Sequence, residues 1–546
     1  MMLFAVVFYA AGYILFPIYA LIKESLMGIG QFSFEPYRQF FRSSLLEASI
    51  NSISISILSV LGSAAVGTFF AYVFTFFEFT AKSFFSKLVL VPLALPPLVG
   101  VISFLFLVGE SGMLSRVLSL VSGASPLLFT MNGWTGIVVV HVYSFYVYFY
   151  LFVSSGLAQL DGNALDASAS LGATRARTIL KVLLPMLSPS LVGASLITFM
   201  SSMASFSAPF LFGGATRYLT LEIYAAKLNG ESSSAAALSI LLLTISVCAL
   251  FFLRWWQSHR QYLSSPKGAK RTSGVGHGKL TRIIVISSAI VILSLFALPI
   301  ITIVTISFVT EGSWTYQIFP TSFTGRNYLH LFAEPHLFEP LVNSIRMALV
   351  ATAGVVCLGV TASYLINRKH FLGRRLLEVI LSLPFGIPGT VIAVGLILGF
   401  NRPSLFSFDS ILVGTFWIMP LAYAVRNLPL LYRSTTAGFE VITPSLYEAS
   451  ETLGSSQFGT FRRVIIPLLL PSIVSGALLV FINSAGEFVS SILLYSYSTK
   501  PVSVEILSQL RLFDLGAAAM YSTLLMLMVL TVVAISNRFL RSTIAM

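Results

Sequence analysis

The side chains that could do chemistry are few, and those of most interest lie in largely apolar sequence. Glu487 lies within the stretch Leu468–Leu494, and His141 is followed seven residues later by Tyr148 on the same face of a helix. A carboxylate in such a stretch can attract a cation, and an imidazole with a phenol can offer polar contacts to a passing solute. The apolar stretches contain no acid–histidine cluster and no H-E-x-x-H sequence, so a membrane-embedded enzyme is disfavoured.

Two roles are open for Glu487. An ionised acid at the centre of a membrane helix costs about 2.5–3.5 kcal/mol on insertion scales, so the side chain is expected to face the protein interior, a partner or water. If Glu487 faces a translocation pathway, it favours cationic cargo. Otherwise it is a buried acid, protonated or hydrogen-bonded, that joins two helices.

The other polar residues also have an alternative role in packing. His141 and Tyr148 belong to a segment rich in tyrosine, where packing is the simpler role. Arg346 and Arg426 are expected to extend towards the membrane surface or to pair with a neighbouring carboxylate.

Prolines interrupt two apolar stretches at corresponding places. Pro96 and Pro97 fall in the first stretch, and Pro388 falls in the run Leu383–Gly389 of the second. Broken helices expose backbone polar groups and often line transporter pathways, so Pro97 and Pro388 are pathway candidates. An ordinary kink is the alternative.

The elements that carry these residues must be membrane helices. Of the 546 residues, 56% are apolar and 10% are charged, against about 45–50% and 25% in soluble domains, which excludes a soluble enzyme. Because a helix needs about 20 apolar residues to cross the hydrocarbon core, we predict an all-α polytopic membrane protein. Twelve spans are expected: Leu3–Ile22, Ile50–Phe74, Leu88–Val108, Trp134–Phe152, Leu187–Phe212, Ala235–Leu253, Ile283–Phe308, Leu341–Ile366, Leu376–Phe400, Ile411–Tyr432, Leu468–Leu494 and Leu515–Ser536.

The distribution of Lys and Arg predicts the orientation. With both termini in the cytoplasm, the inside segments carry about twice as many basic residues as the outside loops. The net charge of +13 therefore reflects cytoplasmic loops, and no nucleic-acid partner is expected.

A basic segment divides the chain into two parts. Residues 1–253 and 283–546 each hold six predicted spans, and residues 254–282 form a Ser/Gly/Lys-containing linker with seven basic and no acidic residues. The GVGHGK within the linker lacks the Gly and Ser/Thr that a phosphate loop requires, so this chain is not expected to hydrolyse ATP itself. Cys248 and Cys357 lie in apolar segments and support neither a disulfide framework nor a thiolate metal site.

The two halves are duplicates. Residues 166–185 (DASASLGATRARTILKVLLP) align without a gap to residues 448–467 (EASETLGSSQFGTFRRVIIP) at an offset of 282. Weaker matches flank them, including Asn51-Ser52 with Asn343-Ser344 and Glu222 with Glu505. Each repeated segment is polar, helix-forming and ends at Pro, which predicts a short surface helix, a glycine turn and re-entry into the bilayer.

Both copies resemble the "EAA" motif of binding-protein-dependent ABC importer permeases: acid-Ala-Ala, three residues, Gly, and nine residues before Ile-x-Leu-Pro. Asp166 replaces Glu in the first copy, and Ser168 and Ser450 replace the third-position Ala. The resemblance implies the type I importer permease fold and a coupling helix in each half that fits a groove of a separate ATPase subunit. The implied coupling residues are Asp166, Ala167, Ser168, Gly172, Glu448, Ala449, Ser450 and Gly454. Small residues there allow close approach, and Gly permits a sharp chain reversal.

The fused two-half layout is similar to permeases of the ferric-iron importer group. The segments Ser205–Gly230 and Ala485–Leu507 carry this similarity; Glu487 stands at the acid of the second, and Ser205 stands at the equivalent position in the first half, where some members have an acid. The resemblance implies alternating access in a bacterial cytoplasmic (inner) membrane. It also implies two ABC ATPase copies that bind ATP and Mg, an extracytoplasmic substrate-binding protein, and no cofactor on this chain.

Cargo and class have alternatives. Ferric iron is the first expectation, and thiamine, a polyamine or aminoethylphosphonate are carried by relatives of the group. Glu222 and Glu505 are either receptor contacts or solvated loop acids. An ion-coupled secondary transporter also has duplicated halves, but the paired cytoplasmic motif argues against it.

Overall fold

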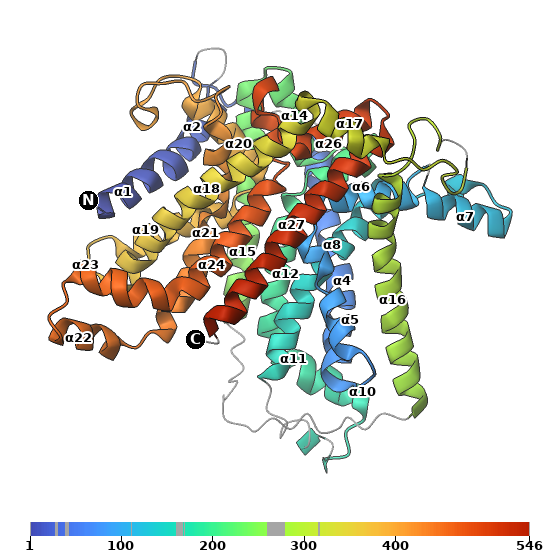
Figure 1. Ribbon diagram of the computed structural model, residues 1–546, viewed down its shortest axis with the longest axis horizontal. Helices are drawn as coiled ribbons and strands as arrows, with labels where there is room; N and C mark the ends of the chain where they lie inside the picture. The colour runs from blue at the N-terminus through green and yellow to red at the C-terminus, as the bar shows by residue number, and fades with distance from the viewer. Residues whose placement is uncertain are drawn as a thin grey trace.

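The computed structural model describes residues 2–27, 31–38, 43–110, 112–159, 167–168, 170–258, 279–314 and 317–544. Within these ranges the chain is helical, with no strand and two isolated β-bridges, Met27 to Phe32 and Val309 to Phe323. Long helices lie side by side, and short helices gather at their ends (Figure 1). A protein that spans a membrane is expected to be built of such helices, because a helix satisfies its backbone polar groups within one segment. The predicted all-α class is confirmed.

The first half contains the elements α1 (Met2–Tyr9), η1 (Ala10–Leu15), α2 (Phe16–Ser25), α3 (Glu35–Arg38), α4 (Ser43–Phe76), α5 (Lys82–Leu88), η3 (Val91–Ala94), α6 (Pro97–Val108), α7 (Met113–Ser122), η4 (Pro126–Phe129), α8 (Gly133–Ala158), α10 (Arg175–Thr178), η5 (Ile179–Leu183), α11 (Leu184–Met186), α12 (Ser188–Met203), α13 (Ser207–Phe212), α14 (Leu219–Leu228) and α15 (Ser232–Ser258). Most of the predicted linker, residues 259–278, lies outside the described residues.

The second half contains α16 (Lys279–Ile306), α17 (Arg326–Ala333), α18 (Pro335–Arg368), α19 (Arg374–Ser382), η6 (Leu383–Gly386), α20 (Gly389–Phe400), η7 (Leu405–Ser407), α21 (Ile418–Val441), α22 (Pro444–Thr452), α23 (Gln457–Thr460), η8 (Phe461–Ile465), α24 (Ile466–Ala485), α25 (Ser491–Leu494), η9 (Tyr497–Thr499), α26 (Val502–Arg511) and α27 (Leu515–Ile544).

Within the described residues, nine helices are long and apolar enough to cross a membrane, and two bent helix pairs raise the number to eleven. The predicted span outside this count is the tenth, which corresponds to α21; this helix carries Arg426, Asn427 and Arg433 and is accordingly less apolar. It begins at Ile418 instead of the predicted Ile411, because residues 411–417 form turns. The prediction of a duplicated multi-span protein is consistent with this count.

Four predicted spans are interrupted: the third and the ninth at the prolines that the sequence indicates, and the fifth and the eleventh where one continuous helix was expected. The ninth span bends by 113° between η6 and α20, and the third breaks at the equivalent place, between η3 and α6. The fifth ends as α12 at Met203, and the eleventh ends as α24 at Ala485, each followed by a non-helical stretch and a short helix. Apolar composition continues through all four breaks, so hydropathy alone does not reveal them.

The two halves interlock. Val6, Tyr9 and Ile14 of the first span are buried in one core with residues of α18, α20 and α21. Conversely, Ala289 and Leu293 of α16 pack against α4 and α8. Figure 1 shows α1 beside α18 and α19 on one flank and α16 beside α5 on the other. The first long helix of each half therefore rests on the opposite half.

Candidate translocation pathway and coupling loops

An ion pair holds the acid that the sequence singles out. Glu487 lies in the non-helical stretch after α24, and not at a helix centre as predicted, because α24 ends at Ala485. Its Oε1 accepts hydrogen bonds from Arg426 Nη1 at 2.7 Å and from the Ser490 backbone N–H at 2.9 Å. The Glu487 side chain is 7% exposed and that of Arg426 is 30% exposed. Of the two charges, the cation is therefore the more accessible one.

Gly389 makes room for this pair. It begins α20 directly after Pro388, and a Cβ at this position would collide with Arg426 Nη1. The Ser490 hydroxyl also donates to the Gly389 carbonyl at 3.4 Å. The break predicted at Pro388 thus brings the backbone of α20 against both α21 and the loop that carries Glu487.

A neutral cluster occupies the corresponding place in the first half. His141 is 2% exposed, and its Nδ1 lies 3.0 Å from Ser59 Oγ and 3.1 Å from Ser202 Oγ. Its Nε2 lies 2.9 Å from Ser205 Oγ. The imidazole therefore joins α4, α8, α12 and the stretch after α12, and the predicted candidates His141 and Ser205 are in direct contact.

The two clusters are related by the repeat offset. Adding 282 to Ser202 and Ser205 gives Ser484 and Glu487, and adding 282 to His141 gives Tyr423. The Tyr423 and Ser491 hydroxyls lie 2.7 Å apart, and Asn427 Nδ2 donates to Ser484 Oγ at 3.2 Å. Each half therefore builds a buried polar network at the same place, but only the second network is charged.

Both clusters lie near contacts between the halves. Tyr148 of the first half lies close enough to Arg426 of the second half to interact with it electrostatically. A Cβ on Gly386 would lie 3.1 Å from the Met200 methyl, and one on Gly486 would lie 2.9 Å from Pro96 Cβ. Pro96, and not the predicted Pro97, makes the contact, because Pro97 is exposed at the start of α6.

The weaker repeat matches include one ion pair in each half. Arg217 Nη1 lies 3.6 Å from Glu222, and Lys500 Nζ lies 2.5 Å from Glu505. Asn51 and Asn343 donate to the carbonyls of Arg217 and Lys500 at 3.1 and 3.2 Å. The repeated asparagines thus position the loops that lead into α14 and α26. The cations are what the sequence interpretation missed; their equal spacing of five residues before each acid was the available signal.

Burial is the main influence on the pKa of Glu222, the acid of the first of these pairs. It raises the pKa of the Glu222 carboxyl above its ordinary value, and the Arg217 cation offsets this shift only in part. Glu505 is more deeply buried, with a side chain 6% exposed. Neither acid is a fully solvated loop residue.

The repeated polar segments form short helices that end at glycine. Gly172 and Gly454 have φ of 73° and 80°, which glycine adopts without strain. The N–H of the next residue bonds back to Ser168 at 3.1 Å in the first half and to Ser450 at 3.1 Å in the second, as in the Schellman helix end. Ala167 and Ala449 are exposed on these helices. Asp166 and the Glu448 side chain lie outside the part of the chain that is described.

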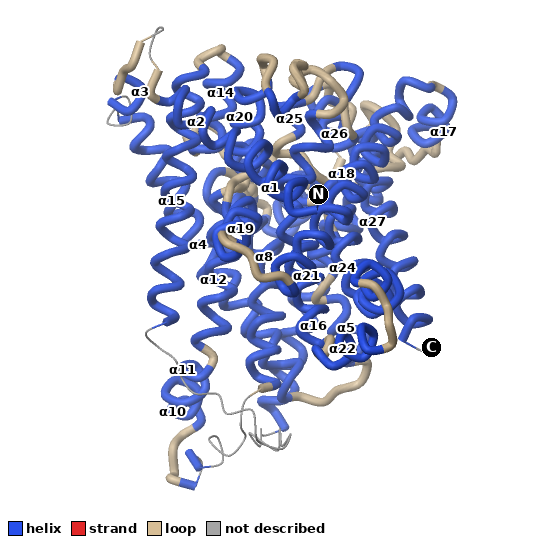
Figure 2. Tube along the Cα trace, turned by 90° about the vertical axis from the view of Figure 1, so that its left-hand side faces the viewer, coloured by secondary structure: helices blue, strands red, loops and turns tan. Residues whose placement is uncertain are grey.

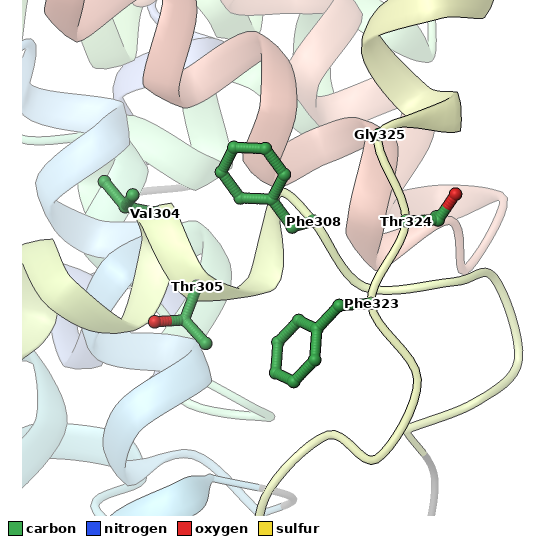
Figure 3. A pocket seen from close by; sticks show the side chains of 6 residues that line it. All are labelled: Val304, Thr305, Phe308, Phe323, Thr324 and Gly325. Atoms are coloured by element: carbon green, nitrogen blue, oxygen red, sulfur yellow. The ribbon is translucent and has the colours of Figure 1, made fainter.

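A pocket at the end of α16 lies away from these elements. It has a volume of about 490 Å³ and is lined by Val304, Thr305, Phe308, Phe323, Thr324 and Gly325. Figure 3 shows Phe308 and Phe323 on its two sides, at the end of α16. None of the predicted site residues lines it. Within the described residues, no three His, Cys, Asp or Glu side chains form a group that could hold a metal ion.

Known proteins resemble the chain over most of its length. Residues 63–260 and 355–542 both match the family of binding-protein-dependent transport system inner membrane components. The "Probable ABC transporter permease protein y4fN" of Sinorhizobium fredii is 28% identical over 81% of this chain and 78% of its own length. The ferric transport system permease protein FbpB of Actinobacillus pleuropneumoniae is 26% identical over 80% of this chain and 63% of its own length. The sulfate transport system permease protein CysT of Escherichia coli is 27% identical over 40% of this chain and 83% of its own length.

The repeated short helices and the matched polar networks show a duplicated chain, and the family match, found once in each half, agrees with that duplication. The chain belongs to the family of binding-protein-dependent transport system inner membrane components and is a multi-pass ABC transporter permease that matches this family once in each half.

Proposed function

We propose that this chain is the membrane subunit of an ATP-driven importer and that it engages two copies of an ABC ATPase. The ATPase copies bind ATP and Mg, while this chain does no covalent chemistry. Both termini and both coupling helices face the cytoplasm in this proposal. A separate extracytoplasmic binding protein delivers the cargo to the opposite face.

The coupling helices carry this proposal. Leu171 and Leu453 occupy equivalent positions on them and are 87% and 88% exposed. Figure 2 shows α10 and α22, which adjoin these positions, towards one end of the molecule, opposite to α14, α20 and α26. A leucine exposed on a polar loop gains stability when a protein groove buries it, which is worth about 1.5–3 kcal/mol for a full side chain.

Coupling requires the ATPases to bind one permease conformation better than another. Closure of two ATPases would bring the two coupling helices together and shift the halves to which they belong. Because the first long helix of each half rests on the other half, that shift would move both halves against each other along the surface that carries Tyr148 and Arg426. Access would then alternate between the two membrane faces.

A test uses the exposed leucines. The double variant Leu171→Asp and Leu453→Asp should insert normally, but it should neither retain the ATPase on purification nor support uptake. Leu372→Asp is the matched control, because Leu372 is fully exposed in the loop between α18 and α19 and lies outside both coupling loops. Asp166→Arg with Glu448→Arg should also abolish uptake. Normal uptake by either double variant would refute the coupling assignment.

Ferric iron is the first cargo that we propose. Its support is the likeness to the ferric-iron group and to the protein named FbpB. In that case Glu487 would contribute negative potential, and Arg426 would need to release it as the halves move.

The ion pair favours a second candidate, an oxyanion or an anionic metal complex. The accessible charge is the Arg426 guanidinium, and planar guanidinium groups suit oxyanion recognition. The likeness to the sulfate permease adds to this candidate. The ligand retained by the partner binding protein, identified by mass and metal analysis, would decide: bound iron without a coordinating anion supports the first candidate, and a bound oxyanion or chelate supports the second.

A further inference from the structure

The same hydrogen bond closes both coupling loops. In the first half, Ser168 Oγ lies 2.8 Å from Thr178 Oγ1. In the second half, Ser450 Oγ lies 2.9 Å from Thr460 Oγ1. Both residues of the second pair stand 282 positions after those of the first, so the bond is part of the duplication.

These bonds use the position at which the chain departs from its motif. The third residue of the acid-Ala-Ala pattern is Ser in both copies, and Ala could not make the bond. Ser168 is 8% exposed and Thr460 is fully buried, whereas Thr178 and Ser450 are partly buried, so each bond has one buried and one partly buried end. Because each half carries one serine and one threonine hydroxyl at equivalent positions, the two bonds are matched at both ends.

One backbone hydrogen bond in each half crosses the glycine between the coupling helix and the next helix, from the Ala173 N–H to the Ser168 carbonyl and from the Ser455 N–H to the Ser450 carbonyl. Gly172 and Gly454 form the joint, and neither has any atom near the place where a Cβ would stand. A side chain at the glycine itself therefore contributes no contact. The hydroxyl pair adds a side-chain contact across the joint, which helps the coupling helix and the next helix to move together.

The segment beyond the joint is anchored in the protein. Leu183 and Leu187 pack with Val153 and Leu157 at the end of α8. Ile465 and Leu469 pack with Phe439 and Ile442 at the end of α21 in the same way. Between joint and anchor, each half has a π-helical turn, η5 or η8, and such turns are frequent at functional sites.

We propose that Ser168–Thr178 and Ser450–Thr460 are latches that fasten each coupling helix to its anchored membrane helix, so that ATPase motion reaches the halves undiminished. Thr178 and Thr460 are positioning residues in this assignment, because they act through the coupling helices and touch neither cargo nor nucleotide. The inference rests on the proposed importer function and adds residues outside the acid-Ala-Ala-Gly pattern to it.

The test compares the number of cargo molecules imported per ATP hydrolysed in the full complex with its binding protein. Ser168→Ala with Ser450→Ala keeps the motif's own residue, so the chain should fold. We expect the transport-to-hydrolysis ratio to fall about fivefold, the bias that one net hydrogen bond typically supplies. Basal hydrolysis and ATPase retention are checked in Thr178→Val with Thr460→Val, which lies outside the coupling residues, and both should stay unchanged there.

Three further variants separate a latch from a merely structural role. Thr178→Val with Thr460→Val should give the same loss, and all four changes together should be no worse than either pair. Thr178→Ser with Thr460→Ser retains the hydroxyls and should restore the wild-type ratio. Ser445→Ala is the matched control, since the Ser445 hydroxyl, at the start of α22, lies 3.0 Å from the Thr443 hydroxyl and on the other side of this helix's residues from the joint at Gly454. It should leave the ratio unchanged.

The outcomes distinguish the two hypotheses. If the wild-type complex shows no hydrolysis stimulated by its binding protein, the proposed importer function fails. If the wild type is stimulated but the alanine and valine pairs retain its ratio, the latch fails and the importer function stands. Additive losses in the fourfold variant would also refute the latch, because two residues in one bond must show coupling.

Discussion

Arg426 reaches Glu487 at 2.7 Å by passing over Gly389, so two charged residues of the membrane domain meet only because a third element lacks a side chain. The pair joins α21, α20 and the loop after α24. The pair also changes the role expected of Glu487 towards cargo, since Arg426 neutralises the buried carboxylate and the guanidinium is the more exposed of the two groups.

Gly389→Ala should break this pair without altering either charge. The new Cβ would occupy the space of Arg426 Nη1 and leave the Glu487 carboxylate buried with one charged partner fewer. Losing a hydrogen bond to a charged group costs about 1.5–3 kcal/mol. We therefore expect a clear fall in the thermal unfolding midpoint of the detergent-solubilised protein. Gly395→Ala, in the same helix but against Leu21 and Pro17, is the comparison; an equal fall would assign the effect to helix packing.

Neutralising one partner at a time should reveal the sign of the cargo. Glu487→Gln leaves the Arg426 cation uncompensated, so uptake of a cation should slow roughly tenfold, equivalent to about 1.4 kcal/mol. Arg426→Gln should instead slow an anion. The double variant removes both charges and should recover part of either loss. Unaltered initial rates of uptake in both single variants would show that the pair serves only in packing.

His141→Leu should destabilise the first half more than the second. Ser59, Ser202 and Ser205 would each lose a partner, although Ser59 keeps its hydrogen bond to the Ile55 carbonyl, and a buried hydroxyl left without a partner costs about 1–3 kcal/mol. The expected readout is faster hydrogen exchange in α4, α8 and α12. His336→Leu, at a side chain 67% exposed, provides the control. Equal protection in the two variants would contradict a structural network.

The outer ion pairs should differ in strength. Lys500→Met leaves Glu505 unpaired by a cation at 6% side-chain exposure, whereas Arg217→Met affects Glu222 at 21%. We expect a loss of about 1–3 kcal/mol for Lys500→Met and under about 1 kcal/mol for Arg217→Met. Thermal unfolding of the two variants side by side checks the order. A larger effect for Arg217→Met would show that exposure does not set the strength of these pairs.

The fold was predictable where one residue type repeats over a long distance. Apolar runs predicted the long helices, and the 282-residue offset between Asp166 and Glu448 predicted two matching halves. Gly172 and Gly454 were predicted as chain reversals, and both have positive φ. These features depend on local composition or spacing, which the sequence displays directly.

Contacts between segments that lie far apart in the sequence were harder to predict. Nothing near Glu487 indicates that Arg426, 61 residues earlier, approaches it over Gly389. The breaks at residues 204–206 and 486–490 were missed, because their composition matches that of the helices around them. Lys500 could have been found, since its place relative to Glu505 repeats that of Arg217 relative to Glu222.

The crossed placement of α1 and α16 bears on how such a protein can be encoded. Each half covers apolar surface that the other cannot hide alone, so the peptide joining residue 258 to residue 279 is not what holds the body together. If the chain were cleaved between residues 258 and 279, we expect the two halves to associate in the bilayer and to form the same structure. Encoding both halves in one gene would then serve mainly to make them in equal amounts.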